Sequence, residues 1–149
     1  TLLSIPNVCG MKFTASDYCQ LERLISDFPD KVFYNGSDEI ILSGLAMGAD
    51  GGIGGTYGVM PELYLKILEL VKEAKIAEAQ EIQYAADAII YKMCSCRGNM
   101  YAVIKEIIRR REGLNLGDVR RPLASLVEAD MPIVEECVAM IDEAIKKFC

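Results

Sequence analysis

Lys12 is the residue of this sequence whose type and neighbours most favour covalent chemistry. It stands in the segment Gly10-Met11-Lys12-Phe13-Thr14. Side chains of a strand alternate between its two faces, so Gly10, Lys12 and Thr14 would share one face. An inward-facing lysine loses hydration, which favours the neutral amine that attacks carbonyl groups. The structural alternative is a strand-end lysine whose tip reaches solvent.

Three further polar residues are candidates for binding, and each also has a structural interpretation. Thr14 begins the run Thr14-Ala15-Ser16-Asp17, which fits a capping box, and Ser16 also fits the N-cap of a helix. Asp38 and Glu39 come early in an expected helix, where carboxylates are favoured in any protein. Spacing alone therefore does not assign a function to these residues.

Residues 51–58 form a glycine-rich segment, Gly-Gly-Ile-Gly-Gly-Thr-Tyr-Gly, between an expected strand and helix. Such a loop allows backbone amides to approach a ligand closely. The segment lacks the third glycine of the dinucleotide motif, because Tyr57 occupies that position, and it lacks the Lys-Ser/Thr of a P-loop. A phosphate cradle and a tight strand-to-helix turn are both compatible with it.

Composition excludes several classes of function. The chain of 149 residues is 52% hydrophobic and 26% charged, which is typical of a globular domain. Its net charge of −6 disfavours nucleic acid and anionic membrane surfaces as partners. We find neither a transmembrane segment nor a signal peptide in the sequence and expect a cytoplasmic protein.

The sequence contains no histidine, which rules out Ser-His-Asp and Cys-His catalysis and zinc sites built on imidazole. The six cysteines are expected to be reduced thiols, buried as small hydrophobic residues. Cys94-Ser95-Cys96 has one intervening residue, fewer than metal-binding pairs use. No metal and no cofactor is therefore expected.

Strand and helix patterns alternate in the first half of the chain, and only helix patterns follow. Strands are expected at residues 8–13, 31–34 and 50–53, and helices at 16–27, 37–47, 61–74, 76–94, 100–111 and 132–148.

Alternating strands and helices predict parallel βα units, but three strands do not close a fold of this kind. An eight-stranded barrel needs around 250 residues. We therefore expect an α/β fold in which residues 1–75 are the last three strand-helix units of a (β/α)8 TIM barrel. Residues 76–149 would be a C-terminal extension of three helices. A small self-contained three-stranded fold is the alternative.

Three motifs carry a resemblance to a known family. They are residues 10–14 (Gly-Met-Lys-Phe-Thr), 34–39 (Tyr-Asn-Gly-Ser-Asp-Glu) and 44–54 (Gly-Leu-Ala-Met-Gly-Ala-Asp-Gly-Gly-Ile-Gly). In order and spacing they resemble the C-terminal half of the N-acetylneuraminate lyases, within the superfamily that includes dihydrodipicolinate synthase. The resemblance covers nearly the whole chain and is densest over residues 8–60. In the synthase branch, the segment matching 34–39 reads more like Ser-Gly-Asp-Asp.

The resemblance implies a barrel, usually a homotetramer, that reversibly cleaves N-acetylneuraminate (sialic acid) to N-acetylmannosamine and pyruvate. By this resemblance Lys12 forms a Schiff base with the C2 ketone, and Thr14 contacts the sugar near its C4 hydroxyl. Gly36, Asp38 and Glu39 would hold the hydroxyl-bearing tail of the sugar.

The sequence departs from the family in two ways. Gly55 stands where many lyases have a serine that contacts the sugar, so we count Gly55 among the substrate-binding positions. The first five strands, the Ser-Thr pair for the pyruvate carboxylate and the proton-transferring tyrosine are not found in residues 1–149. We expect this chain to be an inactive part of a lyase that needs the N-terminal half of the barrel. The alternatives are a related pyruvate-dependent aldolase, a dihydrodipicolinate synthase, or a non-catalytic half-barrel that folds by association.

Overall fold

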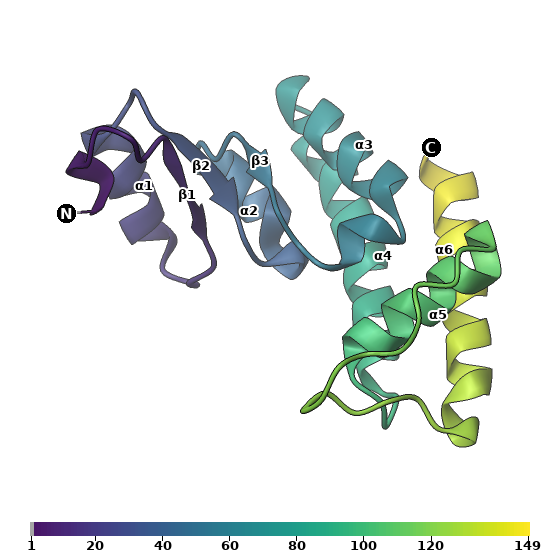
Figure 1. Cartoon of the computed structure of the whole chain (residues 1–149). Coiled ribbons are helices and arrows are strands. Elements are labelled where there is room, and N and C mark those ends of the chain that lie inside the picture. Colours follow the sequence, from purple (N-terminus) through teal and green to yellow (C-terminus); the bar gives the residue numbers. More distant parts are fainter. Residues whose placement is uncertain (1) are drawn as a thin grey trace. The chain divides into compact units, whose positions relative to one another are not determined.

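The computed structural model describes residues 2–149, and its contacts group them into two compact units (Figure 1). The first unit contains residues up to 54 together with 67–83, and the second contains 55–66 and 84–149. The division passes within two helices, α3 (Pro61–Lys72) and α4 (Ile76–Cys94). The boundary expected after residue 75, where the strand signals end, remains a prediction.

A parallel sheet of three strands organises the first unit, as the alternating pattern predicts. The strands are β1 (Gly10–Phe13), β2 (Val32–Asn35) and β3 (Gly51–Gly52), in the spatial order β1-β2-β3. Helices α1 (Tyr18–Asp27) and α2 (Ile41–Ala46) follow β1 and β2. Because the strands are parallel, their carboxyl ends lie at the same edge of the sheet (Figure 1).

Two of the strands are shorter than expected, whereas β2 has the expected four residues but lies one position later, at 32–35 rather than 31–34. The first begins at Gly10 rather than residue 8, since Val8 is still in the turn after η1 (Leu2–Ser4), where its N–H donates to the carbonyl of Ile5. The third has two residues rather than four.

The start of α1 corrects one sequence-based interpretation. The helix begins at Tyr18 rather than at residue 16, and its N-cap is Asp17, whose carboxylate accepts a hydrogen bond from the amide of Gln20. The predicted N-cap at Ser16 and the predicted capping box that begins at Thr14 are therefore both wrong. Thr14 has no part in capping this helix.

The segment expected as one helix at 37–47 is two shorter pieces, η2 (Asp38–Ile40) and α2. Ile40 interrupts them, because its φ of −137° lies outside the helical range. Helix α3 ends at Lys72, two residues early, since the left-handed backbone of Ala74 (φ 58°) follows. Helix α4 has the predicted bounds.

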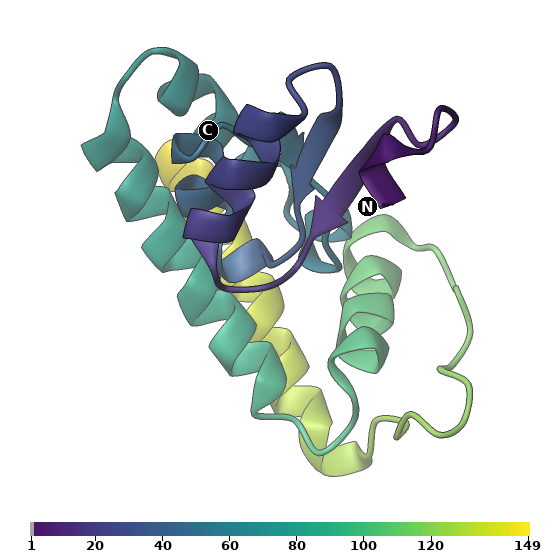
Figure 2. The same cartoon turned by 90° about the vertical axis from the view of Figure 1, so that its left-hand side faces the viewer.

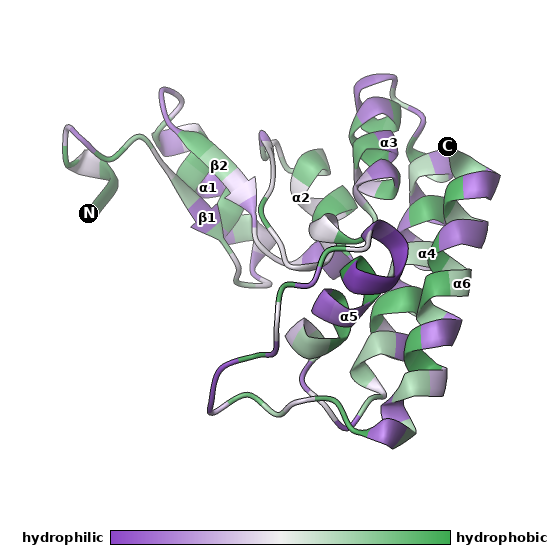
Figure 3. Cartoon of the chain, turned by 45° about the vertical axis from the view of Figure 1, so that its right-hand side comes forward, coloured by the Kyte–Doolittle hydropathy of each residue, from purple (hydrophilic) through white to green (hydrophobic). Residues whose placement is uncertain are grey.

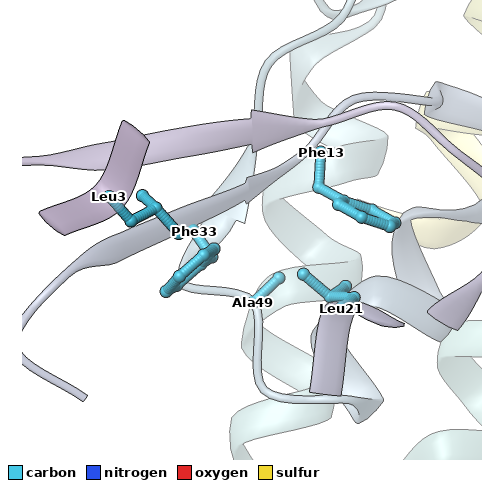
Figure 4. Close-up of a cluster of buried hydrophobic side chains, with 5 residues drawn as sticks. All are labelled: Leu3, Phe13, Leu21, Phe33 and Ala49. Carbon is cyan, nitrogen blue, oxygen red and sulfur yellow. The ribbon is translucent and has the colours of Figure 1, made fainter. Parts of the chain in front are cut away.

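A cluster of buried hydrophobic residues in the first unit lies on one face of the sheet. Its members are shown in Figure 4: Leu3, Phe13, Leu21, Phe33 and Ala49. The opposite face is left uncovered in the described chain, since Lys12 is exposed there and Val32 and Tyr34 keep more than a third of their surface in solvent. The strand that carries Lys12 thus has one packed face and one open face.

The second unit is helical. It contains η3 (Thr56–Gly58), α5 (Met100–Glu112), η4 (Glu128–Asp130) and α6 (Met131–Phe148). Helix α5 starts at Asn99, whose side chain accepts a hydrogen bond from the amide of Tyr101, and ends at left-handed Gly113. A long loop without regular structure leads from α5 to η4, and is the light-green trace in Figure 2. Hydrophilic and hydrophobic residues alternate along α6 (Figure 3), as expected of a helix with one buried face.

The cysteines correct another expectation. Those of residues 2–149 form no disulfide, but they are not generally buried. Cys137 is buried and Cys96 is partly exposed, whereas the remaining four are exposed: Cys9, Cys19, Cys94 and Cys149. Within the described part of the chain, no helix is long and apolar enough to cross a membrane.

Candidate functional site

Lys12, Thr14 and Gly36 lie together at the carboxyl ends of β1 and β2. The amide of Gly36 donates to the carbonyl of Phe13 over 2.7 Å, which draws the turn after β2 against the end of β1. A Cβ atom placed on Gly36 would lie 2.9 Å from Cε of Lys12 and would collide with Oγ1 of Thr14. Only glycine therefore fits at position 36 while the lysine keeps this position.

The surroundings of Lys12 do not provide the expected shielding. Lys12 is exposed, and its partner across β2 is Tyr34, 37% of whose surface is in solvent. Nothing in residues 2–149 covers this face of the sheet. Desolvation of the amine would have to come from other strands of the proposed barrel or from the substrate.

Asp38 is buried, with 6% of its surface exposed, whereas the neighbouring Glu39 is exposed. The Asp38 carboxylate lies directly against Gly54, because any Cβ atom at position 54 would collide with it. The turn before Asp38 is tied to β1 by the hydroxyl of Ser37, which donates to the carbonyl of Thr14 over 3.3 Å. Asp38 and Glu39 are in the first turn of η2, so the structural interpretation as helix-start carboxylates also fits their place.

Three residues not selected from the sequence hold this turn in place: Tyr18, Asn35 and Gln83. Asn35 is fully buried and bonds to both the Tyr18 hydroxyl and the carbonyl of Ser37. Gln83, on α4, bonds to the backbone of Asp38 and Leu42. Asn35 could have been noticed, since it lies inside the motif at 34–39, but no local pattern marks Tyr18 or Gln83.

Gly55, the remaining sequence-derived candidate, belongs to the second unit. A Cβ atom on Gly55 would lie 3.0 Å from Cε1 and 3.5 Å from the hydroxyl oxygen of Tyr101. The Tyr101 ring thus occupies the space beside Gly55 that a side chain at position 55 would enter.

A cavity of about 480 Å³ also lies in the second unit, between α5 and the loop that follows it. Lys105, Arg109, Asp118 and Ser125 are among its lining residues. These groups already pair within the chain, Lys105 with the carbonyl of Asp118, and Ser125 with the carboxylate of Asp118. None of the candidate site residues lines this cavity.

Sequence comparison gives the class of the protein. Residues 1–141 match the model of the Dihydrodipicolinate synthetase family, and the chain belongs to that family. The three-stranded parallel sheet with its helices agrees with this assignment.

Within this family, the chain is similar to N-acetylneuraminate lyases. The chain is 51% identical over 144 residues to the N-acetylneuraminate lyase of Mediterraneibacter gnavus, covering 96% of this chain and 46% of that protein. The N-acetylneuraminate lyase of Rhizobium meliloti is 39% identical over 140 residues, with 94% and 46% covered. The resemblance drawn from the motifs at 10–14, 34–39 and 44–54 is thereby confirmed.

Solved structures agree. The sialic acid aldolase of Ruminococcus gnavus superposes with a TM-score of 0.94 at 50% identity, covering 97% of this chain and 48% of that one. The N-acetylneuraminate lyase of Fusobacterium nucleatum gives a TM-score of 0.74 at 35% identity, with 95% and 45% covered. The chain spans slightly less than half the length of these relatives.

Proposed function

We propose that this chain is part of a class I aldolase that reversibly cleaves N-acetylneuraminate to N-acetylmannosamine and pyruvate. The observation that carries the proposal is the convergence of Lys12, Thr14 and Gly36 in a chain half identical to a sialic acid aldolase. The chain would form the last three strand-helix units of a (β/α)8 barrel and its helical extension. The rest of the barrel would come from the N-terminal half, in a cytoplasmic homo-oligomer that serves carbohydrate metabolism.

The chemistry follows from a lysine at the end of a barrel strand. The Lys12 amine attacks the C2 ketone of the open-chain sugar, and loss of water leaves a protonated imine. The C3–C4 bond then breaks, and its electron pair moves into the imine to give an enamine. Loss of the C4 hydroxyl proton turns C4 into the aldehyde carbon of N-acetylmannosamine. Protonation of the enamine at C3 and hydrolysis of the imine release pyruvate and restore the amine.

The remaining candidates would bind the sugar rather than take part in bond cleavage. Thr14 lies beside Lys12 and would donate to the C4 hydroxyl. Asp38 and Glu39 are acceptors for hydroxyl groups of the sugar tail, and Gly36 leaves room for it. At Gly55 no side chain is available, so a sugar contact there would be made by the backbone or by water.

Reductive trapping tests the proposal. The active protein, in which this chain is joined by the rest of the barrel, is incubated with pyruvate and borohydride, and the modified peptide is mapped. We expect one adduct, on Lys12, and none in a Lys12→Met variant. Lys31→Met is the matched control, because that lysine immediately precedes β2 and its Nζ lies 3.4 Å from the carboxylate of Asp30. An adduct on another lysine, with none on Lys12, would overturn the assignment.

A further inference from the structure

The turn from β2 into α2, residues 36–42, is the best-anchored part of the proposed site. It carries Gly36, Asp38 and Glu39, and hydrogen bonds from buried or partly buried side chains outside the turn reach it from two sides. The side chains that anchor the turn, Tyr18, Asn35 and Gln83, have no role in the cleavage reaction described above.

Tyr18 and Asn35 hold the first side. The Tyr18 hydroxyl is 2.6 Å from Oδ1 of Asn35 and 3.2 Å from the carbonyl oxygen of Ile40, and Nδ2 of Asn35 donates to the carbonyl of Ser37 over 2.6 Å. A Cβ atom on Gly44 would be 2.5 Å from Oδ1 of Asn35, so α2 closes over this amide. Burial, and then the negative charge of Glu39, raise the pKa of Tyr18 to about 12, so its hydroxyl remains a donor at neutral pH.

Gln83 holds the second side from α4. Its Oε1 accepts the amide of Leu42 and its Nε2 donates to the carbonyl of Asp38, each over 3.1 Å. The side chain is buried, with 5% of the residue exposed. Because the donor end and the acceptor end bind different backbone groups, one amide orientation satisfies both bonds.

These contacts fix the backbone on both sides of the Asp38 carboxylate. The carbonyl of Asp38 is held by Gln83, the carbonyl before it by Asn35, and its carboxylate rests against Gly54. A carboxylate held in this way is in place before a ligand arrives, so binding does not have to order the turn.

We propose that Gln83, together with Tyr18 and Asn35, positions residues 36–42 and thereby raises the affinity of the site for a polyhydroxylated substrate tail. The three are positioning residues, since they act through Asp38 and Glu39. The proposal rests on the proposed function in one respect, the assignment of these carboxylates to the sugar.

The test replaces Gln83 with methionine, which has a similar length and shape but makes neither hydrogen bond. Gln80→Met is the matched control, because Gln80 is exposed on the same helix. In the active protein we expect KM for N-acetylneuraminate to rise roughly five- to tenfold, the change that one or two lost hydrogen bonds correspond to. The value of kcat at saturating sugar and the yield of the pyruvate adduct on Lys12 should match the control.

A second variant, Tyr18→Phe, removes one hydroxyl and keeps the ring, so it tests the other side of the turn with little risk to folding. Tyr84→Phe is its control, since Tyr84 is 62% exposed. Amide exchange at Ile40, whose N–H bonds to the carbonyl of Ser37 and not to Gln83, reports the order of the turn directly. We expect faster exchange in Gln83→Met and Tyr18→Phe than in their controls.

The outcomes separate the two proposals. If the unaltered protein does not cleave N-acetylneuraminate, the proposed function fails, and the Ile40 exchange still decides whether the turn is held by Gln83. A KM within twofold of that of Gln80→Met overturns the proposed role in sugar binding. A pyruvate adduct that falls as much as sugar cleavage also overturns it, because Gln83 would then support the fold in general.

Discussion

At the scale of single residues, the proposed site depends on glycines as much as on charged groups. Gly36 admits the Lys12 side chain and the Thr14 hydroxyl, and Gly54 admits the Asp38 carboxylate. Both close approaches exist because a Cβ atom is missing. The family resemblance selected Lys12, Asp38 and Gly36 from the sequence, but the close contacts that require glycine at positions 36 and 54 are seen only once the neighbouring atoms are placed.

Gly36→Ala therefore should impair the imine step. Its new methyl group would overlap Oγ1 of Thr14 and approach Cε of Lys12, so the amine must move. A displacement of about 1 Å at a reacting group slows a reaction by about 100-fold, and we expect a loss of that order in pyruvate trapping. The rate of pyruvate trapping is measured in the active protein by adding borohydride at a series of times.

Gly58→Ala is the control, since a Cβ atom there would meet no other atom within 4 Å. Equal trapping rates in the two variants would show that Lys12 does not need the space beside Gly36.

At the scale of elements, sequence patterns predicted which segments are helices and strands more reliably than where they end. Helix α4 was predicted with its observed bounds, because a helix pattern can be recognised within one continuous stretch of sequence. The start of α1 at Tyr18 and the break at Ile40 were missed. At the first, Asp17 rather than Ser16 makes the capping bond, and the second follows from backbone angles that the sequence does not show.

The sequence likewise predicted some residues of the proposed site and missed others. Lys12, Thr14, Gly36, Asp38 and Glu39 were accessible from the sequence because they stand in contiguous motifs. The contact of Gln83 with the backbone of Asp38 joins positions 45 residues apart. Such a contact depends on tertiary packing, so no local sequence pattern predicts it.

In the second unit, Asp130 joins the start of α6 to the turn before α5, and its role can be tested. Its buried carboxylate accepts the amides of Arg97, Gly98 and Val127 over 2.8, 3.1 and 3.0 Å, and ties the start of α6 to the turn before α5. These backbone hydrogen bonds, that of Val127 foremost, lower the pKa of Asp130. A carboxyl group whose pKa is lower in the folded state stabilises the fold above its unfolded pKa, near 3.8. The stabilisation is lost as pH falls through the folded-state value.

Asp130→Asn should consequently lower the free energy of unfolding at neutral pH. Below pH 4 it should also reduce the number of protons taken up on unfolding, which sets how steeply stability falls with acid, by about one. Urea unfolding at a series of pH values measures both effects. Glu128→Gln, an exposed neighbour in η4, is expected to change neither. An unchanged acid dependence in Asp130→Asn would contradict this account.

At the scale of the whole molecule, the chain contains the proposed nucleophile and part of the proposed sugar site but spans under half the length of its relatives. By the family resemblance, the groups that would hold the pyruvate carboxylate and move the proton would lie outside residues 1–149. A group that transfers a proton commonly contributes a factor of about 10²–10⁴ to the rate. The catalytic apparatus proposed for this family is therefore incomplete in this chain.

We accordingly expect residues 1–149 alone to show no measurable cleavage of N-acetylneuraminate. Activity should appear when the complementary half of the Mediterraneibacter gnavus lyase is supplied as a separate chain, because half of the residues are shared across the matched region. Release of pyruvate, followed with a coupled dehydrogenase, measures it. The Lys12→Met chain with the same complementary half is the control.

Light scattering completes this experiment. A monodisperse monomer of residues 1–149 that cleaves the sugar without any added chain would show that the chemistry does not require the rest of a barrel.

The open face of the sheet has a further consequence, for chemical damage rather than catalysis. Lys12 stands there as an exposed primary amine beside the exposed Val32 and Tyr34. Aldehydes and reducing sugars react with exposed primary amines of this kind without an enzyme, and the reaction with sugars is glycation. The strands that would close the barrel over Lys12 would thus also protect it, and peptide mapping of glycation at Lys12 would measure how far this face remains uncovered.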